Sequence, residues 1–278
     1  MSPLGTTPSQ RPPIRWAGSK RSILPWLSDL APDRFDRYIE PFAGSAALFF
    51  SLAPSSAILG DINQDLVHFY RVLAARPGAV ARAVTLFAPN GGDYYAVRAL
   101  RPNQLSDTKA AARFLYLNRF CFNGVYRTNK RGEYNVPRGT RTGAMPTVCE
   151  LRLASGILRR ANIQACDFET TLDSARRGDF VYIDPPYFTR RGLKPGEYGY
   201  GSLVGRDDLS RLITAVLRLS DRGVKYLLSY SDSRMLIREL EPAWTKRVLV
   251  RRSVGGNSAH RKIVRELILS NYVPTKTK

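Results

Sequence analysis

The chain has 278 residues, of which 44% are hydrophobic, so it can bury a full core as one large domain or two modest ones. Its 43 Lys and Arg against 23 Asp and Glu give a net charge of +20, a surplus that attracts polyanions such as nucleic acid. Without a long apolar run, a signal-peptide core or Cys-x-x-Cys spacing, the sequence favours a cytoplasmic protein with no membrane segment, disulfide framework or metal site.

The first predicted elements have the pattern of an α/β sheet. Residues 1–12 are rich in proline and polar residues, and we expect a disordered tail. Residues 37–42 are typical of a strand that runs into a small-residue helix start, and residues 57–61 of a second strand that ends in an acid. The stretch 63–73 then has helical spacing of its apolar residues.

The middle of the chain has a different pattern. From 73 to 160 it is helical and basic, then rich in turns. Residues 126–128 and 133–136 can pair as a hairpin, in which Gly132 supplies the positive φ that the turn needs. We therefore predict a second domain inserted at 73–160.

The last third returns to α/β patterning. The short buried strand 180–183 is followed by a helical pattern at 207–220 and by strand-like runs at 225–231, 246–253 and 263–272. Alternating strands and helices imply a mostly parallel sheet that helices cover on both faces.

An unusual corner follows the strand 180–183. Asp184, Pro185, Pro186 and Tyr187 come directly after it, and prolines continue neither a sheet ladder nor a helix. Asp184 and Tyr187 are thus held on a stiff, extended corner. An ordinary proline-rich turn with a capping acid explains these four residues equally well.

Gly44 and Asp61 form a second candidate site. Gly44, with small neighbours between a strand and a helix, lets the backbone approach an adenosine-containing ligand at the carboxyl edge of a sheet. An acid at the end of the next strand can accept hydrogen bonds from both ribose hydroxyls. A packing turn and a loop aspartate are the alternatives, and the pairing of the two residues favours the ligand site.

Six short segments resemble the Dam-type DNA adenine-N6 methyltransferases, in the α-type motif order. One such segment is weakly specific, whereas six in order are strongly so. The resemblance extends from Arg15 to about Tyr272 and includes the late segment RRSVGGNSAHRKIVRELIL. Ala46 stands where many relatives carry glycine, and we expect tighter ligand contact there. The six segments are RWAGSK (15–20), EPFAGSA (40–46), DIN (61–63), FNGVYR (122–127), CDF (166–168) and DPPY (184–187).

The resemblance implies an α/β fold, a Rossmann-like methyltransferase sheet with an inserted, mainly helical target-recognition domain that carries a β-hairpin. The catalytic domain would comprise residues 13–72 and 161–273, and the target-recognition domain residues 73–160. The implied cofactor is S-adenosylmethionine, and the implied partner is double-stranded DNA.

The resemblance also implies a set of cofactor-binding residues. The segment with Trp16 and Lys20 would close over the methionine end, where the Lys20 ammonium suits a carboxylate. Asp167 would hold the adenine amine and Phe168 would stack on the adenine ring. A solvated Lys20 and a purely structural Phe168 are the alternatives. The implied set is Trp16, Lys20, Glu40, Phe42, Gly44, Asp61, Ile62, Asp167, Phe168 and Asp184.

The DPPY corner then acquires a chemical role. An exocyclic adenine amine is a poor nucleophile, and Asp184 together with the Pro185 carbonyl can accept its two protons. Tyr187 offers a stacking face for a base that is flipped out of the duplex. The catalytic residues are thus expected to be Asp184, Pro185 and Tyr187.

The DNA contacts implied by the family fall on both sides of a GATC site. Arg127 would donate to a guanine, Val125 and Pro137 would contact a thymine methyl, and Arg15 would approach the outer guanine. Phe122 and Asn123 would wedge into the gap left by the flipped base. A phosphate contact is the alternative for Arg127. The implied set is Arg15, Phe122, Asn123, Val125, Arg127, Pro137 and Arg138.

Two other functions remain open at this point. A methyltransferase acting on a ribosomal RNA base has a similar acid-Pro-Pro-aromatic corner, and a non-catalytic DNA-binding protein could keep the fold. The inserted basic domain favours DNA, and the intact Asp61, Asp167 and Asp184 favour catalysis. A nicotinamide oxidoreductase lacks support because its glycine-rich turn is missing. We expect a monomer, and the sequence leaves open whether a restriction enzyme accompanies it.

Overall fold

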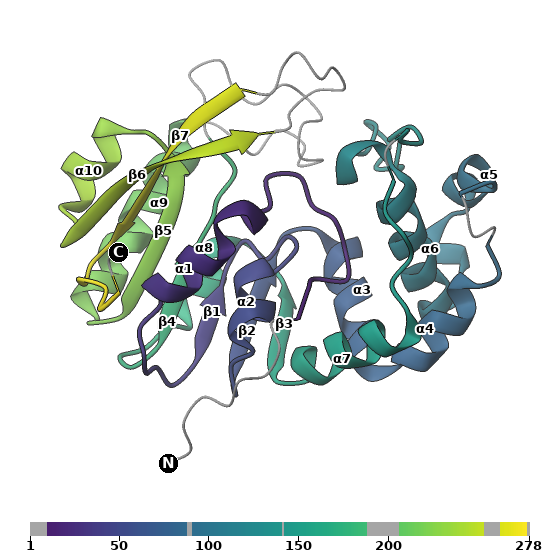
Figure 1. Ribbon diagram of the computed structural model, residues 1–278, viewed down its shortest axis with the longest axis horizontal. Helices are drawn as coiled ribbons and strands as arrows, with labels where there is room; N and C mark the ends of the chain where they lie inside the picture. Colours follow the sequence, from purple (N-terminus) through teal and green to yellow (C-terminus); the bar gives the residue numbers. More distant parts are fainter. Residues whose placement is uncertain (1–9, 88–90, 141, 188–205, 253–261, 277–278) are drawn as a thin grey trace.

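The computed structural model describes residues 10–87, 91–140, 142–187, 206–252 and 262–276. Most of the expected tail, and residues 253–261 of the late family segment, lie outside the described residues. A seven-stranded sheet has the order β3-β2-β1-β4-β5-β7-β6 (Figure 1). The strands are β1 (Tyr38–Glu40), β2 (Ala57–Asp61), β3 (Ala161–Ala165), β4 (Phe180–Ile183), β5 (Lys225–Ser231), β6 (Trp244–Arg252) and β7 (Lys262–Ser270).

The strands β3, β2, β1, β4 and β5 are parallel, and β7 returns antiparallel between β5 and β6. Successive side chains of β1 and β4 enter two separate cores, because neighbouring residues of a strand face opposite sides of the sheet. Both faces are covered by helices, as expected from the sequence. The helices of one face are α1 (Leu24–Leu30), α2 (Ala47–Leu52) and α3 (Gln64–Ala75), and those of the other are α8 (Phe168–Asp173), α9 (Arg206–Asp221) and α10 (Arg234–Leu240).

In the described part of the chain between β2 and β3, four further helices lie to one side of the sheet (Figure 1). Their apolar residues join the core beneath α1, α2 and α3, and a smaller core lies around Tyr94 and Phe120. The predicted boundaries of the inserted domain, residues 73 and 160, stay a prediction. The first boundary falls inside α3, which itself packs against α4, α6 and α7. The four helices are α4 (Pro77–Val84), α5 (Tyr94–Ala99), α6 (Asp107–Phe120) and α7 (Val148–Leu158).

The predicted hairpin follows α6. The amide of Asn135 donates to the Arg127 carbonyl at 3.0 Å, and Thr128 bridges Tyr134. The Gly132 amide closes the turn onto the Asn129 carbonyl, with φ of +77° at Gly132. The positive φ expected at this glycine is therefore present.

Candidate active site

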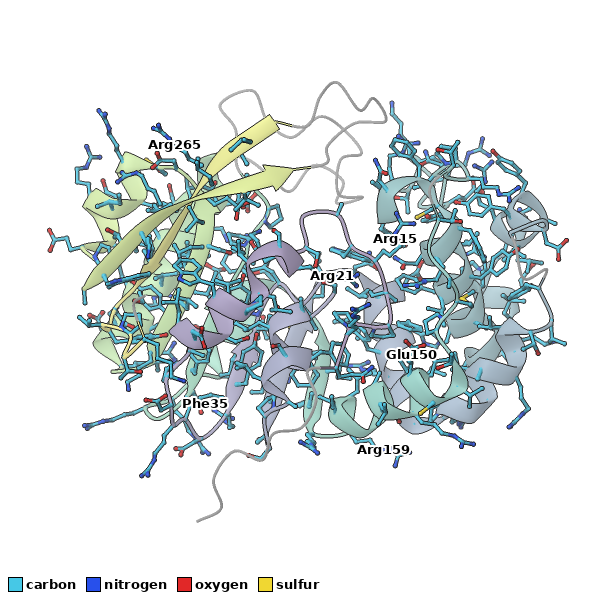
Figure 2. The ribbon with its side chains drawn as sticks, in the orientation of Figure 1. Arg15, Arg21, Phe35, Glu150, Arg159 and Arg265 are labelled. Carbon is cyan, nitrogen blue, oxygen red and sulfur yellow. The ribbon has the colours of Figure 1, made fainter. Side chains whose placement is uncertain are left out.

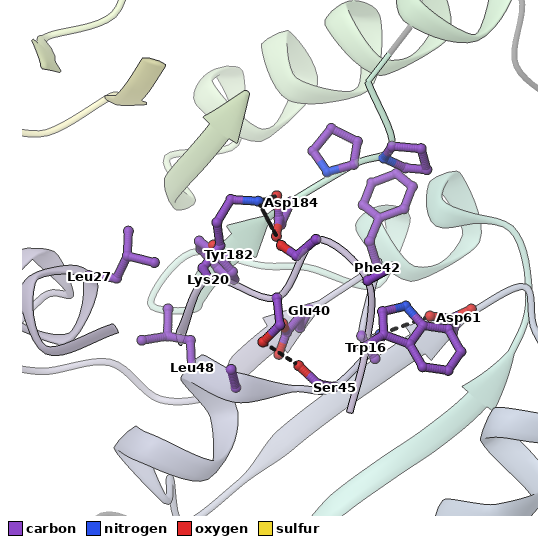
Figure 3. Close-up of a pocket in the computed structure, with 18 of the residues that line it drawn as sticks. Trp16, Lys20, Leu27, Glu40, Phe42, Ser45, Leu48, Asp61, Tyr182 and Asp184 are labelled. Carbon is purple, nitrogen blue, oxygen red and sulfur yellow. Dashed lines mark hydrogen bonds and ion pairs between the residues drawn. The ribbon is translucent and has the colours of Figure 1, made fainter. Parts of the chain in front are cut away.

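A pocket of about 720 Å³, open solvent included, lies where β1, β2 and β4 end (Figure 3). A site at the carboxyl ends of parallel strands is the usual place for a ligand in an α/β sheet. Of the predicted cofactor and catalytic residues, nine line it. They are Trp16, Lys20, Glu40, Phe42, Gly44, Asp61, Asp184, Pro185 and Tyr187.

Asp184 follows β4 directly and is held by two donors. The Lys20 ammonium donates to both carboxylate oxygens, at 2.7 and 2.9 Å, and the Ser229 hydroxyl donates to Oδ1 at 2.9 Å. Burial raises the pKa of Asp184, and the contacts with Lys20 and Ser229 oppose that rise. Tyr187 packs edge-on against Tyr230, with ring centroids 5.1 Å apart.

Lys20 is not a solvated surface residue. Only 6% of it is exposed, and its ammonium lies 4.0 Å from Glu266 as well as on Asp184. The expected partner of Lys20 was the carboxylate of the cofactor, but in this structure its partner is the acid of the DPPY corner. Neither Glu266 nor Ser229 was predicted from the sequence as a site residue. Glu266 could have been noticed as an acid among the apolar residues of β7, whereas nothing in the local sequence distinguishes Ser229.

The turn after β1 is shaped by Trp16 and Asp61. Gly44 has φ of +46°, and a Cβ added there would lie 2.8 Å from the Trp16 indole. The Gly44 amide donates to Asp61 Oδ2 at 2.9 Å, and the Asn63 amide donates to Oδ1 at 2.9 Å. Glycine is therefore required here by its backbone conformation and by the close approach of the indole.

Ala46 is the departure from the family pattern. It has φ of +51°, a left-handed conformation at the residue before α2, and is 1% exposed. Glycine adopts this conformation without the cost that a Cβ brings. The backbone therefore accounts for the glycine of the relatives, and Ala46 is not among the residues that line the pocket.

The predicted adenine-binding residues lie beside the pocket, not in its lining. Asp167 caps α8 by accepting from the Glu169 amide at 3.0 Å. Phe168 is 8% exposed and stacks on Phe42, with centroids 5.3 Å apart, so Phe42 links it to the pocket. Ile62 is 42% exposed.

Glu40 is a buried acid in the pocket wall. Only 2% of it is exposed, and its Oε2 accepts from the Tyr38 hydroxyl at 2.9 Å. Burial raises the pKa of Glu40 well above its ordinary value of 4.5; the Tyr38 hydrogen bond opposes the rise, and the charges of Asp184 and Asp61 add to it. The folded protein therefore holds the Glu40 proton at a pH where the unfolded chain has lost it.

Glu40 should make stability depend on pH. As the pH rises above 4.5, only the unfolded state ionises, so the free energy of unfolding falls until the pH passes the folded pKa. Glu40→Gln removes this dependence. In urea unfolding at about pH 5 and about pH 8, the variant should gain stability relative to wild type at the higher pH. Parallel pH profiles for the two proteins would contradict the assignment.

The predicted DNA contacts meet at the end of α6. The Arg15 amide donates to Asn118 Oδ1 at 2.8 Å, and the Asn118 side-chain amide donates to the Arg15 carbonyl at 2.6 Å. Figure 2 shows Arg15 where the N-terminal segment runs beside this group of helices. A Cβ added to Gly124 would lie 2.7 Å from that of Arg15, so the Phe122–Gly124 turn packs on the same segment.

The hairpin lies against that turn. The Phe122 amide donates to the Pro137 carbonyl at 3.0 Å, and the Tyr134 hydroxyl donates to the Val125 carbonyl at 3.3 Å. Asn123 has φ of +52° within the turn. The recognition region and the N-terminal segment, which carry the predicted DNA contacts, are therefore packed against each other.

Arg127 is held across the hairpin by Asn135. Its Nε donates to Asn135 Oδ1 at 2.8 Å and its Nη2 to the Asn135 carbonyl at 3.4 Å. Cys121 bridges Arg138 on the returning strand. The role of Asn135 was missed because its sequence shows only a polar residue in a turn-rich stretch.

Tyr126 connects the hairpin region with the pocket, which Trp16 lines. Its ring stacks on Trp16, with centroids 6.1 Å apart at 20°, and its hydroxyl donates to Asp65 Oδ2 at 2.6 Å. Asp65 lies on α3, just after the DIN segment. Tyr126 stands inside the FNGVYR segment, but the sequence alone could not reveal the partner in RWAGSK.

The residues of the pocket fit S-adenosylmethionine. Asp61 lines the pocket with a carboxylate, a group whose oxygens suit ribose hydroxyls, and the carboxylates of Asp61 and Asp184 suit a ligand that carries a sulfonium and an ammonium. The described residues contain no group of His, Cys, Asp and Glu able to hold a metal ion. No helix in the described part of the chain is long and apolar enough to cross a membrane.

The sheet order, the helices on both faces and the pocket at the carboxyl edge are those of the Rossmann-like methyltransferase fold. The model for the D12 class N6 adenine-specific DNA methyltransferases matches residues 16–248, and the chain belongs to this family. It is therefore an adenine-specific DNA methyltransferase, and its family implies S-adenosylmethionine as the methyl donor.

Several relatives match nearly the whole chain. The type II methyltransferase M1.LlaDCHI of Lactococcus lactis subsp. cremoris is 32% identical over 94% of this chain and 95% of its own. The retron Ec67 DNA adenine methylase of Escherichia coli is 33% identical over 92% and 89%. The rRNA methyltransferase aviRa from Streptomyces viridochromogenes aligns over 96% of this chain and 89% of its own, with a TM-score of 0.39 and 12% identity.

Proposed function

We propose that this methyltransferase modifies the adenine of a GATC-like site, after flipping that base out of duplex DNA into the pocket beside Asp184. The observation that carries the proposal is the DPPY corner itself. Asp184 stands at the carboxyl end of β4, oriented by Lys20 and Ser229 in a pocket that also holds Tyr187 and Asp61.

In this proposal Asp184 raises the reactivity of the target amine. The lone pair of an exocyclic amine is delocalised into the purine ring, and two acceptors on its protons favour a more pyramidal nitrogen. Asp184 supplies one acceptor and the Pro185 carbonyl the other, and the two prolines keep them at fixed separation. Lys20 and Ser229 orient the carboxylate before the substrate enters.

Bound S-adenosylmethionine supplies the electrophilic methyl group. This chain would hold it at Gly44 in the turn after β1, at Asp61 at the end of β2, at Glu40 in the pocket wall, and at Trp16 beside them. Asp167 and Phe168, next to Phe42, would receive the adenine end. Ile62, the remaining residue of the implied set, directly follows Asp61 in the chain.

Flipping is required because the target amine lies inside the duplex. Tyr187 would provide a stacking face that repays part of the unstacking energy. Phe122 and Asn123, on the turn packed against Arg15, would fill the gap in the duplex. We expect the protein to act as a monomer in the cytoplasm.

The Arg127 contact tests the proposed site. Arg127→Ala should lower discrimination against changes at one guanine of GATC by about 1–3 kcal/mol, because a guanidinium can donate twice to guanine O6 and N7. Dissociation constants for GATC duplexes and for duplexes with that guanine replaced give the discrimination directly.

Arg131 provides the matched control for this variant. It is exposed at the tip of the same hairpin, so Arg131→Ala should weaken all duplexes alike, as a phosphate contact does. If Arg127→Ala also weakens cognate and scrambled duplexes equally, Arg127 reads no base.

A further inference from the structure

Arg211, on α9, is bound by three carboxylates. Two of them lie at the beginning of α8, and the third lies on α9 itself. Its Nη2 donates to Asp167 Oδ1 at 2.8 Å and to Glu169 Oε2 at 2.6 Å, and its Nη1 donates to Asp208 Oδ1 at 3.0 Å. Because the planar guanidinium has donors in fixed directions, these contacts also fix the acids that accept from it. Arg211 thus ties α9 to the beginning of α8.

The contact with Arg211 leaves one oxygen of Asp167 for another donor. Asp167 Oδ1 accepts from both Arg211 and the Glu169 amide, at 2.8 and 3.0 Å. Among the described residues, none donates a hydrogen bond to Asp167 Oδ2. The carboxylate is thereby held in one plane, with a negatively charged acceptor presented at a defined place.

Arg211 also covers Phe168. Its guanidinium carbon lies 4.9 Å from the centre of that ring, and the ring stacks on Phe42, which lines the pocket. One side chain therefore fixes both the acceptor on Asp167 and the aromatic group beside it.

We propose that Arg211 is a positioning residue that makes the cofactor site selective for a 6-aminopurine. It orients Asp167 so that Oδ2 can accept from an amine, whereas a 6-oxopurine presents an acceptor to the same oxygen and is rejected. This inference rests on the proposed binding of the adenine end of S-adenosylmethionine at Asp167 and Phe168.

The test measures binding of two ligands by calorimetry without DNA. S-adenosylhomocysteine carries the 6-amino group, and S-inosylhomocysteine carries a carbonyl in its place. Wild type should prefer the amino compound by about 10- to 100-fold, the range for one hydrogen bond to a charged group. Arg211→Met should reduce that preference to within about threefold, and KM for S-adenosylmethionine should rise with kcat unchanged.

Two further variants keep the test decisive. Arg218→Met, at an exposed position of the same helix, should keep the wild-type preference. If Arg211→Met does not fold, Arg211→Lys replaces it, because a single ammonium cannot hold all three acids and should lose most of the preference.

The possible results separate the inference from the proposed function. An unchanged preference in the folded Arg211 variant overturns the positioning role. Tighter binding of both ligands also overturns it, because Arg211 would then compete with the purine. If wild type binds neither ligand, the proposed cofactor site is wrong and the inference fails with it.

Discussion

Asp184→Ala is expected to lower the rate of methyl transfer by about 10²- to 10⁴-fold, the range for losing a group that acts on the reacting atoms. The affinity for S-adenosylmethionine should change little, because the proposed ribose contact is at Asp61. Single-turnover methylation of unmethylated duplex DNA, with the cofactor dissociation constant measured separately, distinguishes the two effects.

The same change removes a buried ion pair, so stability needs its own control. Asp179, just before β4, is 1% exposed and accepts from Arg37 Nη2 at 2.6 Å. Asp179→Ala breaks a comparable pair at the other end of the strand and should cost stability without lowering the rate. A rate loss of equal size in both variants would mean that Asp184 acts only through the fold.

Asp184 should also set the acid limb of the activity profile. Because burial raises its pKa, its carboxylate is protonated at a higher pH than an exposed aspartate. A protonated carboxyl cannot accept from the amine as strongly, so we expect activity to fall on acidification through this raised pKa.

Asp61→Ala is expected to raise the dissociation constant of the cofactor by about 10- to 100-fold, because hydrogen bonds to a charged acceptor are lost. It also leaves the buried amides of Gly44 and Asn63 without their carboxylate. At saturating cofactor, the rate of transfer should return close to the wild-type value.

A ligand without ribose hydroxyls separates the two consequences. The 2′,3′-dideoxy form of S-adenosylhomocysteine cannot donate to Asp61, so wild type and Asp61→Ala should bind it with similar affinity. If the variant loses as much affinity for this ligand as for S-adenosylhomocysteine, Asp61 supports the turn rather than the ribose.

The fold was predictable where local patterns were strong. The apolar runs of β2, β4 and β5 and the periodic helices α3 and α9 were found, and the prolines after β4 marked the catalytic corner. The sequence ANIQA gave no strand signal for β3, because this edge strand alternates weakly between exposed and buried positions. The short helices α8 and α10 were missed because six or seven residues hold too few periodic positions.

The sequence predicted which residues line the pocket, but not which of their side chains contact each other. The motifs identified residues that line the pocket. They did not reveal that Lys20 pairs with Asp184, which lies 164 positions further along the chain, or that Trp16 packs against Gly44 and Tyr126. Such pairs depend on how strands and turns are brought together. The local sequence therefore does not reveal such long-range contacts, and neither Ser229 nor Arg211 belongs to a recognisable motif.

We propose that Asp184 and its pocket methylate the N6 amine of adenine in a GATC-like site of duplex DNA. Incubation of the protein with methyl-labelled S-adenosylmethionine and unmethylated duplex DNA, followed by nucleoside analysis and mapping of the modified bases, tests it most directly. We expect N6-methyladenine at the adenine of GATC-like sites, formed about 10²- to 10⁴-fold more slowly with Asp184→Ala. Methylated cytosine, label on ribosomal RNA instead of DNA, or N6-methyladenine outside such sites would contradict it.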